Sequence, residues 1–297
     1  MKKSYLAIAA AAVIIIIAAA VLLTAVKPKS YTVSEEGIVS FGARPAANYT
    51  ISFYNETDVA KIYKIVFWSV DRNVYGLLSI PKTGFMNATF ILLPAQSIPK
   101  EEEQKWLGTD LNKKGYAAFS LDQRGIGETG SVFMNANLEF EKFKNGDMPE
   151  QYKMFYDALA AFDVLGSINY TRNTKIYMAG ESMGGRVAII AGAIEPRIAG
   201  VMGISTGGYG LVENNDYMTK LYVRSVDPDN YVSLISPRKL LLLHSNGDSV
   251  VDVSNAERTF GYANEPKKLL EDDGQDHGYY RHEKVVTLNE GLMWLIA

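Results

Sequence analysis

The 297-residue chain contains no cysteine and only three histidines. The absence of cysteine excludes disulfides, a thiolate nucleophile, cysteine-bound zinc and iron–sulfur clusters. Three histidines leave little material for a histidine-rich metal site. The formal net charge of −3 gives no basic surface for nucleic acid. We therefore expect no metal, no cofactor and no nucleic-acid partner.

One long hydrophobic run is present, and it lies at the N-terminus, where Tyr5–Val26 contains no charge, proline or glycine. At about 1.5 Å per residue, roughly 22 helical residues span about 33 Å, enough to cross a hydrocarbon core of about 30 Å. We predict that residues 1–29 form a single-pass anchor in the lipid bilayer, with residues 30–297 on the extracytoplasmic side. The alternative is a cleaved signal sequence, which would make the protein secreted.

The part of the chain after the anchor is predicted to be one domain and is more acidic than the whole. The first 30 residues hold four lysines and no acidic residue, so removing their charge of +4 from −3 leaves −7. A charge of this size favours solubility and disfavours tight docking of the domain on anionic lipid.

The hydrophobic pattern of residues 30–297 is typical of an α/β domain. Ile62–Ser69 and Val74–Ile80 flank a polar turn, which predicts an antiparallel hairpin. Amphipathic stretches such as Gln151–Leu165 then alternate with short apolar runs. The runs are Phe90–Leu93, Tyr116–Leu121, Ile176–Ala179, Gly200–Ser205, Leu240–His244 and Lys267–Leu270. Such alternation predicts a mostly parallel sheet covered by helices on both faces, with ligands beyond the carboxyl ends of the strands.

Two segments match the motif G-x-S-x-G, centred on Ser182 and Ser205. A nucleophile elbow needs a strand, a sharp turn that exposes the serine, and then a helix. Ser182 follows a predicted strand and precedes a credible helix over Arg186–Ala191, whereas Ser205 runs into Gly207–Gly210, which disfavours a helix. We therefore predict that Ser182 is a nucleophile and that Ser205 is a strand-end residue near the site.

A serine nucleophile needs a base, and the base needs an acid that orients it. In an elbow of this kind the three residues follow along the chain in the order serine, acid, histidine, where the histidine is the base. His277 lies in a loop just after the last predicted strand and is preferred as the base over His282, where the C-terminal helix is expected to begin. Asp248 lies in a turn after Leu240–His244 and is preferred as the acid over Asp252, which is expected at a helix N-terminus. His244, at the end of its strand, is expected to be a buried histidine.

The tetrahedral intermediate needs two backbone N–H donors for its oxyanion. Met183, directly after the nucleophile, is expected to supply one of them. The second is expected from the loop Pro94–Ser97, with Gln96 as the best candidate.

The chain resembles the α/β-hydrolase superfamily, in particular its prolyl-oligopeptidase and dienelactone-hydrolase branches. The segments that carry the resemblance are Gly180–Gly185 (GESMGG), Asp122–Thr129 (DQRGIGET), His244–Val253 (HSNGDSVVDV) and Asp276–Gly278 (DHG). The resemblance implies a twisted, mostly parallel sheet of about eight strands and a serine triad on Ser182, Asp248 and His277. One departure is that Pro94-Ala95 stands where many relatives have His-Gly after the third strand.

The segment Gly125–Gly130 formally matches the dinucleotide-binding motif G-x-G-x-x-G but lacks the strand directly before it and the helix after it. A loop held in place by Asp122 and Arg124 is the preferred interpretation. Segments 131–149 and 207–236 are expected to form small lids over the strand ends. Four tyrosines of the second segment either line a substrate pocket or pack the loop: Tyr209, Tyr217, Tyr222 and Tyr231.

These features predict a membrane-anchored serine hydrolase that cleaves carboxylic ester bonds through an acyl-enzyme, with a small-molecule ester as its substrate. The first alternative is a prolyl-oligopeptidase-like serine peptidase that acts on short peptides. The second is a non-catalytic binding protein with the hydrolase fold.

Overall fold

The computed structural model describes residues 30–84, 87–130, 134–210, 216–279 and 285–297. Tyr31–Ala297 forms one compact unit. The predicted membrane segment Tyr5–Val26 lies outside the described residues. Among the helices within these ranges, none has the length and hydropathy needed to span a bilayer.

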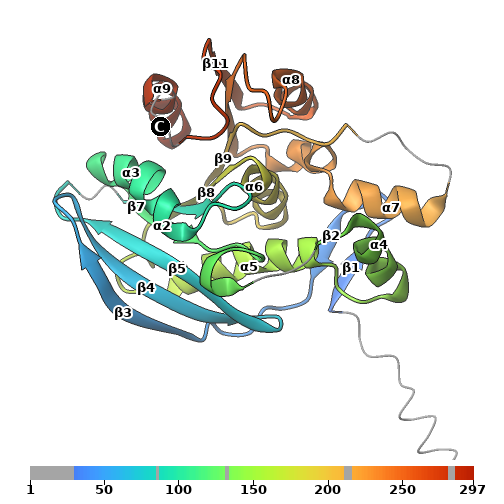
Figure 1. Ribbon diagram of the computed structural model, residues 1–297, viewed down its shortest axis with the longest axis horizontal. Coiled ribbons are helices and arrows are strands. Elements are labelled where there is room, and N and C mark those ends of the chain that lie inside the picture. The colour runs from blue at the N-terminus through green and yellow to red at the C-terminus, as the bar shows by residue number, and fades with distance from the viewer. Residues whose placement is uncertain (1–29, 85–86, 131–133, 211–215, 280–284) are drawn as a thin grey trace, which may run out of the picture. The chain divides into compact units, whose positions relative to one another are not determined.

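A sheet of nine strands in the order β11-β10-β9-β8-β6-β7-β5-β4-β3 forms the centre of this unit (Figure 1). The strands are β3 (Tyr49–Glu56), β4 (Ala60–Ser69), β5 (Arg72–Pro81), β6 (Ala88–Leu93), β7 (Ala117–Leu121), β8 (Lys175–Glu181), β9 (Gly200–Ile204), β10 (Lys239–Ser245) and β11 (Lys267–Asp272). Neighbours from β11 to β7 pair in parallel, and β7, β5, β4 and β3 pair antiparallel. The predicted mostly parallel sheet is confirmed.

The hairpin expected near residues 62–80 is also confirmed, with β4 and β5 joined by the turn Val70-Asp71. The sequence prediction missed the edge strand β3 and the two-stranded sheet of β1 (Tyr31–Val33) and β2 (Val39–Phe41). The last two are only three residues long. All of β3 after its first residue is exposed, although Tyr49, Ile51 and Phe53 alternate with polar residues in a strand-like pattern that the prediction overlooked.

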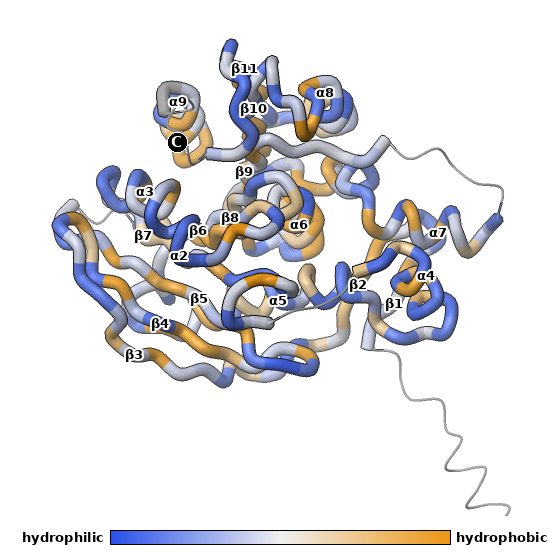
Figure 2. Tube along the Cα trace, in the orientation of Figure 1, coloured by the Kyte–Doolittle hydropathy of each residue, from blue (hydrophilic) through white to orange (hydrophobic). Residues whose placement is uncertain are grey.

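Helices cover both faces of the sheet (Figure 1). They are α2 (Lys100–Glu103), α3 (Thr109–Lys113), α4 (Ala136–Asn145), α5 (Glu150–Ser167), α6 (Met183–Ile194), α7 (Tyr217–Val226), α8 (Val253–Tyr262) and α9 (Val285–Ile296). Alternate residues of β6 face opposite sides: Phe90 and Leu92 pack in the core under α3 and α9, and Ile91 and Leu93 in the core under α5 and α6. Figure 2 shows hydrophobic residues along α6 and α9.

The loop Gly125–Gly130 is held by buried ionic groups, as expected. The Asp122 carboxylate accepts hydrogen bonds from Lys100 Nζ at 2.7 Å and from the Glu128 N–H at 2.8 Å. Arg124 is fully buried, and its Nε donates to Asp157 at 2.7 Å. Gly127 has φ +52, and an added Cβ atom would lie 2.3 Å from Asp122 Oδ2. The glycines therefore serve the turn around Asp122.

Two carboxyl groups, Glu103 on α2 and Glu181 at the end of β8, are buried together beside the start of α6. Burial is the main cause that raises the pKa of Glu103 well above its ordinary value. The charge of the Glu181 carboxyl and its hydrogen bond to Glu103 raise this pKa further. Glu181 Oε2 also accepts a hydrogen bond from the Tyr279 N–H at 3.0 Å. Glu103 therefore holds its proton at pH values where an exposed glutamate has lost it.

This pair predicts a pH dependence of stability. Because the folded-state pKa of Glu103 is raised, its contribution is fully present below the unfolded-state pKa of about 4.3 and is lost as pH rises toward the folded-state value. Replacing Glu103 by glutamine removes that loss. We expect the difference in free energy of unfolding between Glu103→Gln and the wild type to shift in favour of the variant as pH rises above about 5. The shift should be up to about 1.4 kcal/mol per pH unit, measured by urea denaturation.

Glu102→Gln is the matched control, since Glu102 lies on the same helix with its side chain 49% exposed. Its unfolding free energy should run parallel to that of the wild type across the same pH range. Parallel curves for Glu103→Gln as well would contradict the shared buried proton.

Candidate active site

Ser182 occupies a sharp turn between β8 and α6, at the carboxyl end of a central strand. Its φ of +51 and ψ of −115 are outside the regions that a serine normally adopts, and such a conformation costs about 1–3 kcal/mol. The Ser182 N–H donates to the Ile204 carbonyl at 2.9 Å, and Thr206 Oγ1 donates to the Ser182 carbonyl at 2.7 Å. β9 and the loop after it thus hold the strained residue on both sides.

The glycines that flank Ser182 are required by close backbone contacts. An added Cβ atom on Gly180 would lie 2.3 Å from the Gly184 carbonyl oxygen. One on Gly184 would lie 2.0 Å from the carbonyl oxygen of Leu93, the last residue of β6. These glycines therefore remove side chains that would collide where the strand and the helix meet.

His277 and Asp248 form a hydrogen-bonded pair at the same edge of the sheet. Asp248 follows β10 and His277 follows β11, and the two strands are parallel neighbours. His277 Nδ1 lies 2.9 Å from Asp248 Oδ2 and 3.1 Å from Oδ1. The Asp248 side chain is fully buried, and that of His277 is 17% exposed. The structure therefore brings the predicted base and acid together.

The Asp248 carboxylate is stabilised in its charged form. Burial alone raises its pKa, but the Val251 N–H, the His277 ring and the Val250 N–H outweigh burial and hold the pKa below its ordinary value. The two backbone donors lie 3.0 and 2.9 Å from Oδ1. Asp248 is therefore ionised at neutral pH and can stabilise a protonated His277.

The loop that carries His277 is tied to the residue before Ser182. The Gly278 N–H donates to Ser205 Oγ at 2.9 Å, and the Tyr279 N–H donates to Glu181 at 3.0 Å. Within the described residues, Ser182 Oγ makes no hydrogen bond to His277. Contacts of this kind are often long before substrate binds.

The remaining candidates occupy the places that their sequence context indicates. Ser205 is fully buried at the end of β9, and no helix follows it directly. His244 is buried, with Nε2 2.8 Å from the Val251 carbonyl oxygen. Asp252 caps α8, accepting from the Ser254 N–H at 2.9 Å. His282 lies outside the described residues.

Two backbone N–H groups beside Ser182 have no acceptor within the described part of the chain. Met183 is the first residue of α6, where a helical N–H has no intrahelical partner. Gln96 lies in the loop after β6, and this loop packs on Gly184. Pro94 and Ala95 are buried, and the loop turns at Ser97 with φ +69. The loop thus achieves its turn without glycine, and both predicted oxyanion donors stand at the same cavity.

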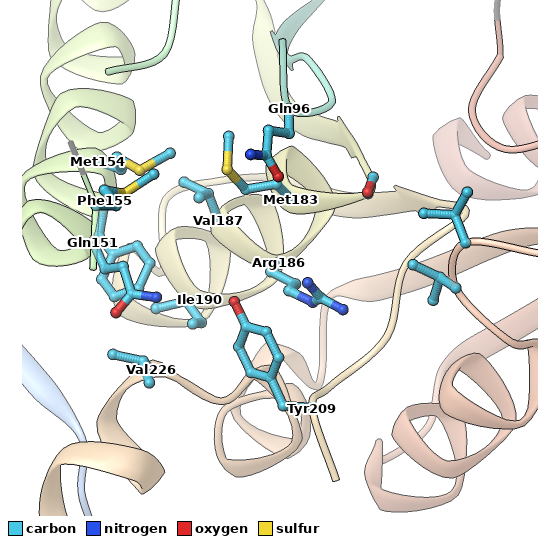
Figure 3. A pocket seen from close by; sticks show the side chains of 14 residues that line it. Gln96, Gln151, Met154, Phe155, Met183, Arg186, Val187, Ile190, Tyr209 and Val226 are labelled. Carbon is cyan, nitrogen blue, oxygen red and sulfur yellow. The ribbon is translucent and has the colours of Figure 1, made fainter. Parts of the chain in front are cut away.

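A cavity of about 380 Å³ adjoins Ser182 and lies between α5 and α6 (Figure 3). Its lining residues are Gln96, Met134, Gln151, Met154, Phe155, Ser182, Met183, Arg186, Val187, Ile190, Tyr209, Val226, Val250 and Val251. Met134 belongs to segment 131–149, and Tyr209 and Val226 belong to segment 207–236. The cavity is mostly apolar, with a few polar groups near the serine, which is typical of a small-molecule site.

Of the four tyrosines in segment 207–236, Tyr209 alone lines this cavity. Tyr222 packs on Phe140 and Phe143 of α4, with ring centroids 5.6 and 5.2 Å apart. Tyr231 is fully buried and hydrogen-bonds to the Val39 N–H at 2.9 Å. Tyr222 and Tyr231 therefore pack the loop, whereas Tyr209 borders the site. No group of side chains suited to a metal ion occurs among the described residues.

Sequence comparison matches residues 103–221 to a family model described as serine aminopeptidase, S33. The uncharacterized protein YfhR of Escherichia coli O157:H7 is 26% identical over 165 residues, which cover 54% of this chain and 52% of YfhR. The chain thus spans about half the length of the curated relatives it matches.

Two solved proteins have a similar fold. Acetyl xylan esterase 1 from a Thermoanaerobacterium species superposes with a TM-score of 0.63 at 16% identity, over 84% of this chain and 89% of the esterase. Est1E from Butyrivibrio proteoclasticus, solved with ferulic acid bound, has a TM-score of 0.59 at 19% identity, over 78% of this chain and 98% of Est1E.

The sheet order, the strained serine between β8 and α6, and the family match agree with one another. The chain has the α/β-hydrolase fold, and its site has the composition of a serine hydrolase.

Proposed function

We propose that this protein hydrolyses carboxylic esters through an acyl-enzyme on Ser182. The observation that carries the proposal is the hydrogen-bonded pair of His277 and Asp248. The loop that carries His277 is bonded to Glu181, the residue directly before the strained Ser182, and Ser182 borders a mostly apolar cavity. A small-molecule ester is the proposed substrate. Ester hydrolysis also agrees with the names of the two solved neighbours.

In the proposed mechanism His277 Nε2 accepts the proton of Ser182 Oγ while that oxygen attacks the ester carbonyl carbon. Asp248 holds the Nδ1–H and stabilises the imidazolium that forms. The Met183 and Gln96 N–H groups stabilise the oxyanion, and loss of one such donor typically costs about 3–4 kcal/mol. His277 then protonates the leaving alkoxide. Water, activated by the same histidine, releases the acid.

The family description raises aminopeptidase activity as a second candidate. An aminopeptidase must bind the ammonium group of a peptide N-terminus, and this requires a negative charge beside the serine. Among the described residues that line the cavity, the one charged side chain is Arg186, which is positive. This electrostatic environment disfavours a free amine and favours an ester.

The nucleophile assignment predicts a labelling pattern. We expect a fluorophosphonate probe to label the wild type and Ser205→Ala, and to leave Ser182→Ala unlabelled. Ser182 is at the elbow and lines the cavity, whereas Ser205 is fully buried. In-gel fluorescence after a timed reaction measures the outcome, and the reverse pattern would refute the assignment.

The same assay with His277→Ala tests the base. Without an acceptor for the serine proton, we expect labelling and ester turnover to fall by about 10³-fold or more. A loss below tenfold would assign the base to another residue, with His282 as the next candidate.

A substrate panel separates the two enzyme candidates. We expect p-nitrophenyl esters of short acids to be cleaved with a kcat/KM at least about 100-fold above that of leucine p-nitroanilide, because the described lining residues include no carboxylate to bind the ammonium group. N-acetyl-leucine p-nitroanilide is the matched control. Faster cleavage of the free amine than of its acetylated form would establish the aminopeptidase instead.

We also propose that residues 1–29 anchor the protein in a membrane, with the hydrolase domain on the extracytoplasmic side. The support is the uncharged run Tyr5–Val26, which is long enough to cross a bilayer. The full-length chain should sediment with membranes after alkaline carbonate washing, and a chain that begins at Ser30 should stay in solution. Release of the full-length chain by carbonate, or a mature N-terminus beyond residue 26, would contradict the anchor.

A further inference from the structure

Arg186 projects into the substrate cavity one helical turn after Ser182. It lies in the first turn of α6, and its N–H donates to the Ser182 carbonyl at 3.2 Å. Residues four apart on a helix share one face, about 6 Å apart along the axis. Figure 3 shows the Arg186 guanidinium beside the Tyr209 ring in the cavity. A positive charge therefore stands close to the bond that the enzyme would cleave.

The Arg186 guanidinium has no carboxylate partner in the part of the chain that the structure describes. Within the described residues it makes one hydrogen bond, from Nε to the Gly207 carbonyl at 2.9 Å, although a guanidinium has five N–H donors. Other arginines of the domain pair with carboxylates, namely Arg44, Arg124, Arg197 and Arg258. Arg238 instead donates to four backbone carbonyls. Among the described residues, Arg186 is thus half-buried without the carboxylate partners of Arg44, Arg124, Arg197 and Arg258.

The contacts that Arg186 does make fix its orientation and leave its terminal nitrogens available. Nε is held by Gly207, and the guanidinium carbon lies 4.1 Å from the centroid of the Tyr209 ring. Stacking of this kind holds the guanidinium plane in place, and the two terminal nitrogens form a fork that matches a carboxylate. A preorganised fork binds an anion with little loss of side-chain freedom.

We propose that Arg186 binds a carboxylate of the substrate, so that the natural substrates are esters with a carboxylate a few atoms from the scissile carbonyl. This inference rests on the proposed ester hydrolysis at Ser182. The carboxylate belongs either to the acid part, as in a half-ester of a short dicarboxylic acid, or to the alcohol part. The apolar lining of Met154, Phe155 and Ile190 accommodates the hydrocarbon portion.

The test uses two pairs of esters that differ in charge and not in shape. The first pair is mono-p-nitrophenyl glutarate and its analogue in which an isopropyl group replaces the carboxylate. The second pair is the acetate of m-hydroxybenzoate and the acetate of m-isopropylphenol. Each compound is assayed with wild type, Arg186→Gln and Arg186→Lys, and thermal unfolding checks that each variant is folded.

In at least one pair we expect the wild type to prefer the anionic ester by about tenfold or more in kcat/KM, as a charged hydrogen bond provides. Arg186→Gln should reduce that preference at least about tenfold, mainly through KM, and Arg186→Lys should keep part of it. The pair that shows the effect identifies the part of the ester that carries the carboxylate. If Arg186 had a purely structural role, Arg186→Gln would lower kcat/KM equally for both esters of a pair. That result would overturn the proposal.

Inhibition of the wild type gives a second test that needs no variant. Free glutarate should compete with the neutral ester, and its diamide should not. Equal inhibition by the two compounds, or a wild-type preference for the neutral ester in both pairs, would overturn this inference while ester cleavage at Ser182 stands. Failure to cleave all four esters, with Ser182 unlabelled by fluorophosphonate, would overturn the proposed function itself.

Discussion

At the end of β8 the backbone of Gly180 meets that of Gly184, and Gly184 in turn meets the Leu93 carbonyl at the end of β6, with no space for a Cβ atom on either glycine. This three-way backbone contact forces strand and helix to meet at a sharp angle and places Ser182 at φ +51. It also sets the loop that carries Gln96 against the first turn of α6. The position of the serine and the two unpaired N–H groups are consequences of one packing constraint.

A strained turn persists only where the surrounding structure holds it, and here buried hydrogen bonds do so. Thr206 and Ile204 bond to the Ser182 backbone. On the other side, Ser205 and Glu181 hold the loop after His277 through two backbone N–H groups. The serine and the histidine are thus both held through residues at the ends of neighbouring strands.

The sequence was sufficient to predict the central strands, because β6 to β10 are buried on both faces and appear as continuous apolar runs. It also indicated the elbow and the Asp248–His277 pair, since motif and chain order are local properties. Other features depend on contacts between distant segments. The pairing of Glu103 with Glu181 and the bond from Gly278 to Ser205 follow from tertiary packing, as does the lack of a carboxylate partner for Arg186 within the described ranges. The exposed edge strand β3 does carry an alternating pattern of Tyr49, Ile51 and Phe53, which the sequence prediction overlooked.

The central claim is that Ser182 attacks a carbonyl whose oxygen is received by the Met183 and Gln96 N–H groups. A crystal structure of the protein after reaction with a p-nitrophenyl alkylphosphonate tests this most directly. The account predicts phosphorus bonded to Ser182 Oγ, with one phosphoryl oxygen about 2.7–3.1 Å from both nitrogens. Phosphorus on another residue, or a phosphoryl oxygen directed away from both N–H groups, would contradict it.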